Sequence, residues 1–143
     1  MRYIYSMVRF VPNPASGEFV NVGAIAGSDD AGDWAVRQVS NPARARSLGP
    51  IASLNALFAF LNEVGGQIDE FNSRIDTLEP PKLELSESWL TDLYVRRRNI
   101  VQLSPPAPIV ADSAEDALDV VFEHLINEPV VERRGYASPD LDP

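Results

Sequence analysis

The segment that most limits the fold is residues 2–11, RYIYSMVRFV, whose aromatic and β-branched residues predict a strand. Successive side chains of a strand point to opposite faces. One face would carry Tyr3, Tyr5, Met7, Arg9 and Val11, and the other would carry Ile4, Ser6, Val8 and Phe10. Both faces are largely apolar, so we expect a central strand of a sheet that helices cover on at least one side.

Turn-forming residues divide the following part of the chain into two more strands. PNPASG (12–17) predicts a plain connection, and EFVNVGAIAG (18–27) predicts the antiparallel return strand. After the SDDAGD turn (28–33), WAVRQVS (34–40) predicts a third strand. NPARARSLG (41–49) then predicts a short helix, with Asn41 as its cap, that ends at Gly49.

A helical pattern begins at Ile51, where apolar residues recur at spacings of three and four. The stripe resumes after Gly65-Gly66, and each glycine costs about 1 kcal/mol inside a helix, so we expect a break or kink there. Further helices are predicted after Ser86 and after Asp112-Ser113. Between them, NIVQLS (99–104) predicts a fourth strand and PPAPIVA (105–111) an extended crossover.

This order of elements predicts an α+β fold with a mostly antiparallel sheet, made of an N-terminal three-stranded meander and a later strand, packed with helices. A chain of 143 residues has the usual length of one domain. We therefore expect a single α+β domain over 1–130 and a polar, flexible tail over 131–143.

The available residue types exclude several kinds of active site. The chain has no cysteine, which excludes disulfides, thiolate catalysis and cysteine-based zinc sites. Its one histidine, His124, cannot build a multi-histidine metal site and is predicted to be a solvated surface residue. No nucleotide-binding glycine motif precedes a helix. We expect no metal and no cofactor, and the pattern leans away from an enzyme.

The charge of the chain is negative and uneven. The net charge is −9, of which −7 belongs to residues 112–143. Nucleic-acid binders usually carry a basic patch, and the one dense basic run here is Arg96-Arg97-Arg98, so nucleic acid is an unlikely partner. No apolar run reaches the length that spans a bilayer, and the N-terminus is unlike a signal peptide. We expect a soluble, cytoplasmic protein with no membrane partner.

Three polar residues interrupt the first two predicted strands and are the candidate ligand or partner contacts: Arg9, Glu18 and Asn21. If Arg9 pairs opposite Asn21, an arginine and an amide share one sheet face. If Arg9 pairs opposite Val20, it shares a face with Glu18 and an arginine–carboxylate pair can form. These groups either satisfy one another structurally or contact a ligand or partner on a rigid sheet.

The arginine run Arg96, Arg97 and Arg98 has two interpretations. It falls at a predicted helix C-terminus, where cations are favoured by the helix dipole. A weaker alternative is an anion contact. Two other arginines, Arg44 and Arg46, are expected to face solvent or to pair with aspartates of the 28–33 turn.

The chain resembles an uncharacterised bacterial family, domain of unknown function 3037. The likeness lies in YSMVRFVPNPASGEFVNVGAIA (5–26), especially Arg9, Pro12, Gly17-Glu18 and Asn21-Val22-Gly23. It continues in IVQLSPPAPIVADSAEDALDVVFEHLI (100–126), which is similar to the family's closing strand, crossover and helix. The resemblance implies a partner-dependent role beside a HipA-like kinase, and it supplies no catalytic residue.

Two functions follow as hypotheses. The first is a small cytoplasmic interaction or accessory protein that acts through a protein partner. The alternative is an enzyme or binder of a phosphorylated or nucleotide-like ligand that uses Arg9, Glu18 and Asn21. The sequence does not predict the oligomeric state.

Overall fold

A computed structural model describes residues 1–74, 85–97 and 99–126, and the predicted α+β class is confirmed. The strands are β1 (Arg2–Phe10), β2 (Val20–Ser28), β3 (Asp33–Gln38), β4 (Val101–Leu103) and β5 (Ala107–Val110). The helices are α1 (Ala43–Leu48), α2 (Ile51–Arg74), α3 (Glu87–Arg96) and α4 (Ala114–Val121), which continues into the π-helical turn η1 (Phe122–Ile126). Arg98 and the segment 131–143 lie outside the described residues.

The strands form one antiparallel sheet in the order β3-β2-β1-β4. The predicted meander of β1, β2 and β3 is confirmed, and β4 pairs with the C-terminal half of β1. The crossover prediction for 105–111 was incomplete, because β5 pairs with the N-terminal half of β1, from Arg2 to Tyr5. Pro108 lies within β5 and lacks an N–H, which is tolerated at a sheet edge but hides the strand in the sequence.

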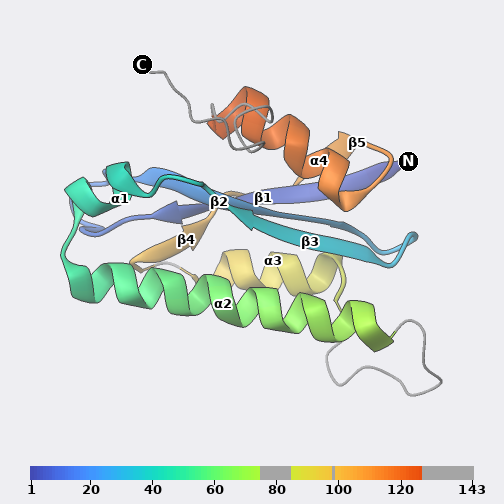
Figure 1. The fold of residues 1–143 in the computed structure, drawn as a ribbon, viewed down its shortest axis with the longest axis horizontal. Helices are drawn as coiled ribbons and strands as arrows, with labels where there is room; N and C mark the ends of the chain where they lie inside the picture. Colours follow the sequence, from blue (N-terminus) through green and yellow to red (C-terminus); the bar gives the residue numbers. More distant parts are fainter. Residues whose placement is uncertain (75–84, 98, 127–143) are drawn as a thin grey trace.

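Helices cover both faces of the sheet (Figure 1). On one face, Ile4, Val8 and Phe10 of β1 join a core with α2 and α3. On the other face, Tyr3 lies in a second core with α4, and Tyr5 and Met7 pack against that core. The face assignment made from the alternation is therefore confirmed, and the helical cover is on two sides.

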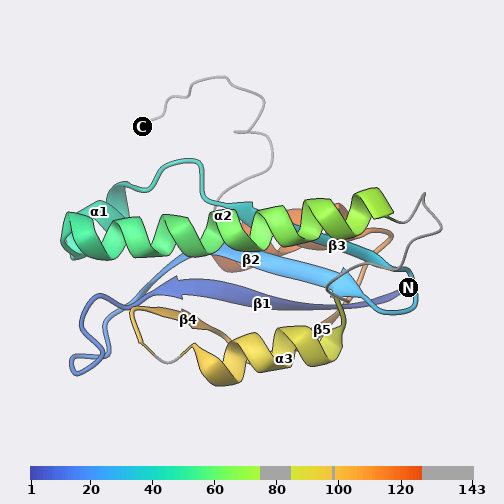
Figure 2. The ribbon, with the colours of Figure 1, turned by 90° about the horizontal axis from the view of Figure 1, so that it is seen from below.

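Within the first helical layer, α2 and α3 run side by side under the sheet (Figure 2). Trp34 of β3 is buried and meets Trp89 of α3 edge to face, with ring centroids 5.4 Å apart. Arg97 at the end of α3 stacks over Phe60 of α2 at 4.5 Å and lies 4.0 Å from a carboxylate oxygen of Glu63. These contacts join the two helices to each other and to the sheet.

The expected break at Gly65-Gly66 is wrong, because α2 is one helix from Ile51 to Arg74. Leu61, Val64 and Ile68 are all buried against the same core, so the apolar face is continuous across the glycines. Burying side chains of this size contributes about 1.5–3 kcal/mol each, which outweighs the cost of the glycines.

Side chains of β3 hold α4 to the opposite face. The first N–H of the helix, from Ala114, donates to Asp33 Oδ2 at 2.7 Å. Arg37 donates to Glu115 Oε1 at 2.7 Å and to Asp119 Oδ1 at 2.8 Å. Burial by itself lowers the pKa of the Arg37 guanidinium, but the hydrogen bonds to the two carboxylates outweigh it and raise that pKa. The helix is thus anchored at its start and along one side.

Candidate functional site

Arg9 lies at the centre of a polar row that crosses three neighbouring strands. In the register of the sheet it is opposite Asn21 of β2 and opposite Gln102 of β4. All three side chains are half-buried, and Arg9 Nε donates to Asn21 Oδ1 at 3.4 Å. Of the two registers considered from the sequence, the structure has the one that joins Arg9 to the amide. We call Asn21, Arg9 and Gln102 the Arg9 row.

A β-bulge produces this register. Val8 pairs with Gly23 and Arg9 pairs with Asn21, so Val22 is an extra residue in β2. Val22 is buried in the core with α2 and α3, whereas Asn21 faces the side of α4 together with Arg9. At Gly23 a Cβ atom would lie 2.6 Å from the backbone oxygen of Arg37, so the adjacent strand requires glycine there. The triplet Asn21-Val22-Gly23 therefore combines a polar contact, a bulge and a close backbone approach.

The ring of Phe19 also contacts the Arg9 side chain and helps to position it. The guanidinium carbon of Arg9 lies 4.6 Å from the centroid of Phe19, which is 47% exposed. Tyr3 belongs to the second core, with α4 and η1, and Tyr5 and Met7 pack against that core. Arg9 is the next residue of β1 on the same face. Arg9 makes no ion pair within the described part of the chain. A guanidinium so placed is oriented and still able to bind an anionic group.

Glu18 does not join the Arg9 row. Glu18 is exposed, and its backbone N–H donates to Ser16 Oγ at 3.4 Å. It lies in the connection before the first residue of β2. It lines a shallow hollow together with Phe19, Arg44 and Leu48. Of the three sequence-predicted residues, the structure brings Arg9 and Asn21 into contact and leaves Glu18 on a neighbouring surface.

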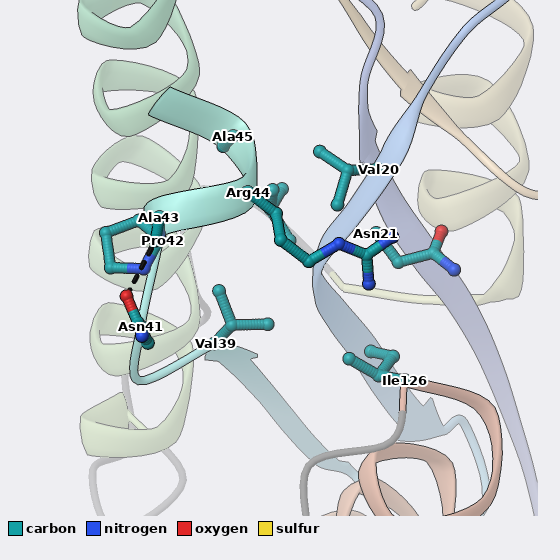
Figure 3. A pocket seen from close by; sticks show the side chains of 10 residues that line it. Val20, Asn21, Val39, Asn41, Pro42, Ala43, Arg44, Ala45 and Ile126 are labelled. Atoms are coloured by element: carbon teal, nitrogen blue, oxygen red, sulfur yellow. Dashed lines mark hydrogen bonds between the residues drawn. The ribbon is translucent and has the colours of Figure 1, made fainter. Parts of the chain in front are cut away.

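A second hollow, of about 240 Å³, lies between α1 and the outer edge of β2, and we call it the α1 hollow. Figure 3 shows the Arg44 side chain extending from α1 toward β2 near Asn21, with Val39 and Ile126 also at the cavity. Asn41 Oδ1 accepts a hydrogen bond from the N–H of Ala43 at 3.0 Å, but the N-cap residue of α1 is Pro42, so the prediction of Asn41 as the cap is wrong by one residue. Arg44 is exposed, as expected from the sequence.

The arginines at the end of α3 have a structural position. Arg96 is exposed in the last turn, the N–H of Arg97 donates to the carbonyl of Leu93, and the Arg97 side chain contacts α2. The helix-terminus interpretation is thus supported for these two residues, and Arg98 lies outside the described residues. His124 is exposed on η1, as predicted.

The described residues contain no cluster of three or more His, Asp or Glu side chains with the geometry of a metal site. Carboxylates gather instead on α4, on the loop before it and on η1, where Asp116, Asp112 and Glu123, respectively, are exposed. None of the helices in residues 1–74, 85–97 and 99–126 is long and apolar enough to cross a bilayer. The surface around Arg9 and Arg44 carries these two cations and the amides of Asn21 and Gln102, with the carboxylate of Glu18 beside Arg44, and the surface around α4 is acidic.

Several residues near this site were not singled out from the sequence. Phe19 was part of a strand pattern, Gln102 belonged to a distant strand, and Asn41 was taken only as a cap. Arg44 was expected to face solvent, without a link to Asn21. The polarity of Gln102 in a short apolar strand is a signal that could have identified it. Side chains directly opposite each other on neighbouring strands interact, so a polar residue there is a candidate partner for Arg9 once the register is known.

Comparison with known proteins places the chain in a family. No curated protein and no solved structure matches it at significant similarity. A family model described as "Protein of unknown function (DUF3037)" matches residues 5–126. The match extends from Tyr5 within β1 to the end of η1 and includes the Arg9 row and the described lining residues of the α1 hollow. The chain belongs to the DUF3037 family.

Proposed function

We propose that this protein is a small interaction or accessory protein that binds a protein partner through the Arg9 row and the adjacent ring of Phe19. The observation that carries the proposal is the half-buried Arg9 guanidinium, which is held by Asn21 and Phe19 without an ion pair in the described chain. Because the row lies on three paired strands, its donors are fixed before a partner arrives.

The chemistry of this surface fits an acidic segment of a partner. Arginine binds carboxylates through two parallel hydrogen bonds, and arginine and aromatic residues are enriched among the residues that dominate binding energy at interfaces. Phe19 adds an exposed apolar surface beside the charge. A HipA-like kinase is the partner that the family resemblance suggests, and we expect the interaction to take place in the cytoplasm.

The alternative, a site for a phosphorylated or nucleotide-like ligand made by Arg9, Glu18 and Asn21, has less support. Glu18 lies on a different hollow from Asn21, and its carboxylate there would repel a phosphate. Arg9 lines neither of these two hollows. Neither of these two hollows is lined by all three residues.

Affinity purification from the native host tests the proposal. The tagged full chain would be compared with the variant Arg9→Met, which keeps the aliphatic part of the side chain, and with Arg96→Met as a matched control on an exposed helix end. We expect a stoichiometric protein partner with the wild type and with Arg96→Met, and its loss with Arg9→Met.

Circular dichroism melting of each variant shows whether the fold is kept. The proposal is contradicted if the wild type retains no stoichiometric partner after chemical crosslinking in cells. It is also contradicted if Arg9→Met binds the partner as well as the wild type does.

A further inference from the structure

We propose that the α1 hollow binds the C-terminal residue of the partner, with its carboxylate on Arg44 and its aliphatic side chain against the apolar wall. This inference rests on the proposed function, because it supposes that the ligand belongs to a protein. The two sites adjoin at Asn21, which belongs to the Arg9 row and lines the hollow, but Arg9 itself does not line the hollow.

The hollow exists because β3 is shorter than β2. The pairing of the two strands stops at Gly23, so the first residues of β2 have no paired strand on that side in the described chain. The last ladder pair joins Gly23 to Gln38, and the N–H of Val39 then donates to the carbonyl of Val22 at 2.8 Å. Beyond this point the chain turns away into α1 (Figure 3). Within the described residues, no strand pairs with the outer edge of β2 at Val20 and Asn21. An extended chain end can approach such an edge, as in recognition by strand addition.

The size of the hollow favours one residue over a larger ligand. Its volume is about 240 Å³. Pockets for drug-sized ligands hold roughly 300–1,000 Å³, so a nucleotide would not be enclosed. A single aliphatic residue with its terminal carboxylate is of a suitable size.

The lining of the hollow combines one cation with apolar walls. Among residues 1–74, 85–97 and 99–126, no acidic residue lines the hollow and none forms an ion pair with Arg44. The side-chain oxygen of Asn41 accepts the N–H of Ala43, which leaves the Asn41 amide nitrogen as a donor. One guanidinium and one amide suit a singly charged carboxylate better than a phosphate.

Apolar residues line the same small space as the guanidinium: Val20, Val22, Val39 and Ile126. A chain end that carries valine, leucine or isoleucine presents its carboxylate and its aliphatic group on one Cα atom, and so fits both features together. An aspartate or glutamate side chain of a partner would fill the polar part and leave the apolar wall uncovered. This distinction favours a chain terminus over an internal acidic residue.

Fluorescence anisotropy with short fluorescein-labelled peptides tests the inference on the full chain. The peptides end in valine, leucine or isoleucine, and each is made with a free or an amidated C-terminus. We expect saturable binding of the free acids, weakened roughly tenfold or more by amidation and by Arg44→Gln. Arg46→Gln is the matched control, because Arg46 is an exposed neighbour on α1 that lines a different hollow.

Three results would overturn the inference: no saturable binding of any free acid, equal binding of amidated peptides, or equal binding by Arg44→Gln. Competition by isovalerate or inorganic phosphate at the same concentration as the peptide would also overturn it in favour of a small anion. If the purified partner loses its last residue and still binds in an Arg9-dependent way, this inference fails while the proposed function stands. If the peptides bind as expected but no partner depends on Arg9, the proposed function fails instead.

Discussion

The hydroxyl of Tyr3 donates a hydrogen bond to Asp33 Oδ2 across 3.0 Å, and the same oxygen accepts the N–H of Ala114 at 2.7 Å. One carboxylate thus connects the central strand, an outer strand and the start of α4. Tyr3 is only 2% exposed, so water cannot replace Asp33 as the partner of the buried hydroxyl.

Substitution Asp33→Ala is expected to lower the free energy of unfolding by about 2–4 kcal/mol, because it leaves a buried hydroxyl and a helix N–H without an acceptor. Denaturant titration followed by circular dichroism measures the change. Asp30→Ala is the matched control, since Asp30 is exposed in the same turn, and it should shift stability by less than about 0.5 kcal/mol. An equal effect of the two substitutions would contradict the bridging role of Asp33.

The phenol of Tyr3 should lose its proton at a higher pH than an ordinary tyrosine does. Burial, followed by the hydrogen bond to Asp33, raises the pKa of Tyr3 from 10.0 to about 12. Because the folded-state pKa is above the unfolded one, the stability that this group contributes is fully present below pH 10 and is lost as the pH rises through about 12. Ultraviolet absorbance of tyrosinate during a pH titration should show a late step that Tyr3→Phe removes. Ionisation of all four tyrosines near pH 10 would contradict the expectation.

Substitution Arg37→Met is expected to loosen α4 from the sheet. The Arg37 side chain is 12% exposed and bonds two carboxylates, of which Glu115 is largely exposed. Since exposed partners contribute little, we expect a loss of about 1–2 kcal/mol in unfolding free energy. Hydrogen exchange should show faster exchange of α4 amides in this variant. The control Arg96→Met should leave α4 protected, and unchanged exchange in Arg37→Met would refute the anchoring role.

Alanine at two glycines should change stability in opposite directions. Gly23→Ala would place a Cβ 2.6 Å from the backbone oxygen of Arg37 and should cost roughly 1–3 kcal/mol. Gly66→Ala meets no atom within 4 Å in the continuous helix α2 and should stabilise by about 0.5–1 kcal/mol. Thermal melts of the two variants measure the difference. Destabilisation by Gly66→Ala would indicate that α2 needs flexibility at that point.

Alternation and periodicity were enough to predict the parts of the fold in which local pattern and burial agree. The two faces of β1 follow from its side chains; helical cover was expected on at least one of them, and both are buried. The glycine pair in α2 was misread because local propensity counts against a helix there, while tertiary packing of Leu61, Val64 and Ile68 sustains it. Strand β5 was missed because it is short and contains Pro108, so that its pairing with β1 is visible only in three dimensions.

The candidate site was predicted in part for the same physical reasons. Arg9 and Asn21 stood out as polar residues in apolar strands, and the structure brings them together. Their register depends on the bulge at Val22, which no local pattern of residues reveals. Arg44 reaches β2 only because β3 ends at Gln38 and α1 folds back beside the strand, which is a property of the topology.

One edge of the sheet is divided between two short strands, β4 and β5, and this affects how readily two molecules can associate through that edge. These strands have three and four residues, and Pro108 of β5 has no N–H to donate. A long flat edge with regularly spaced donors invites a neighbouring molecule to extend the sheet, which is a common start of aggregation. The edge here is short and divided, so we expect this edge to resist pairing with the sheet of another molecule in concentrated solution.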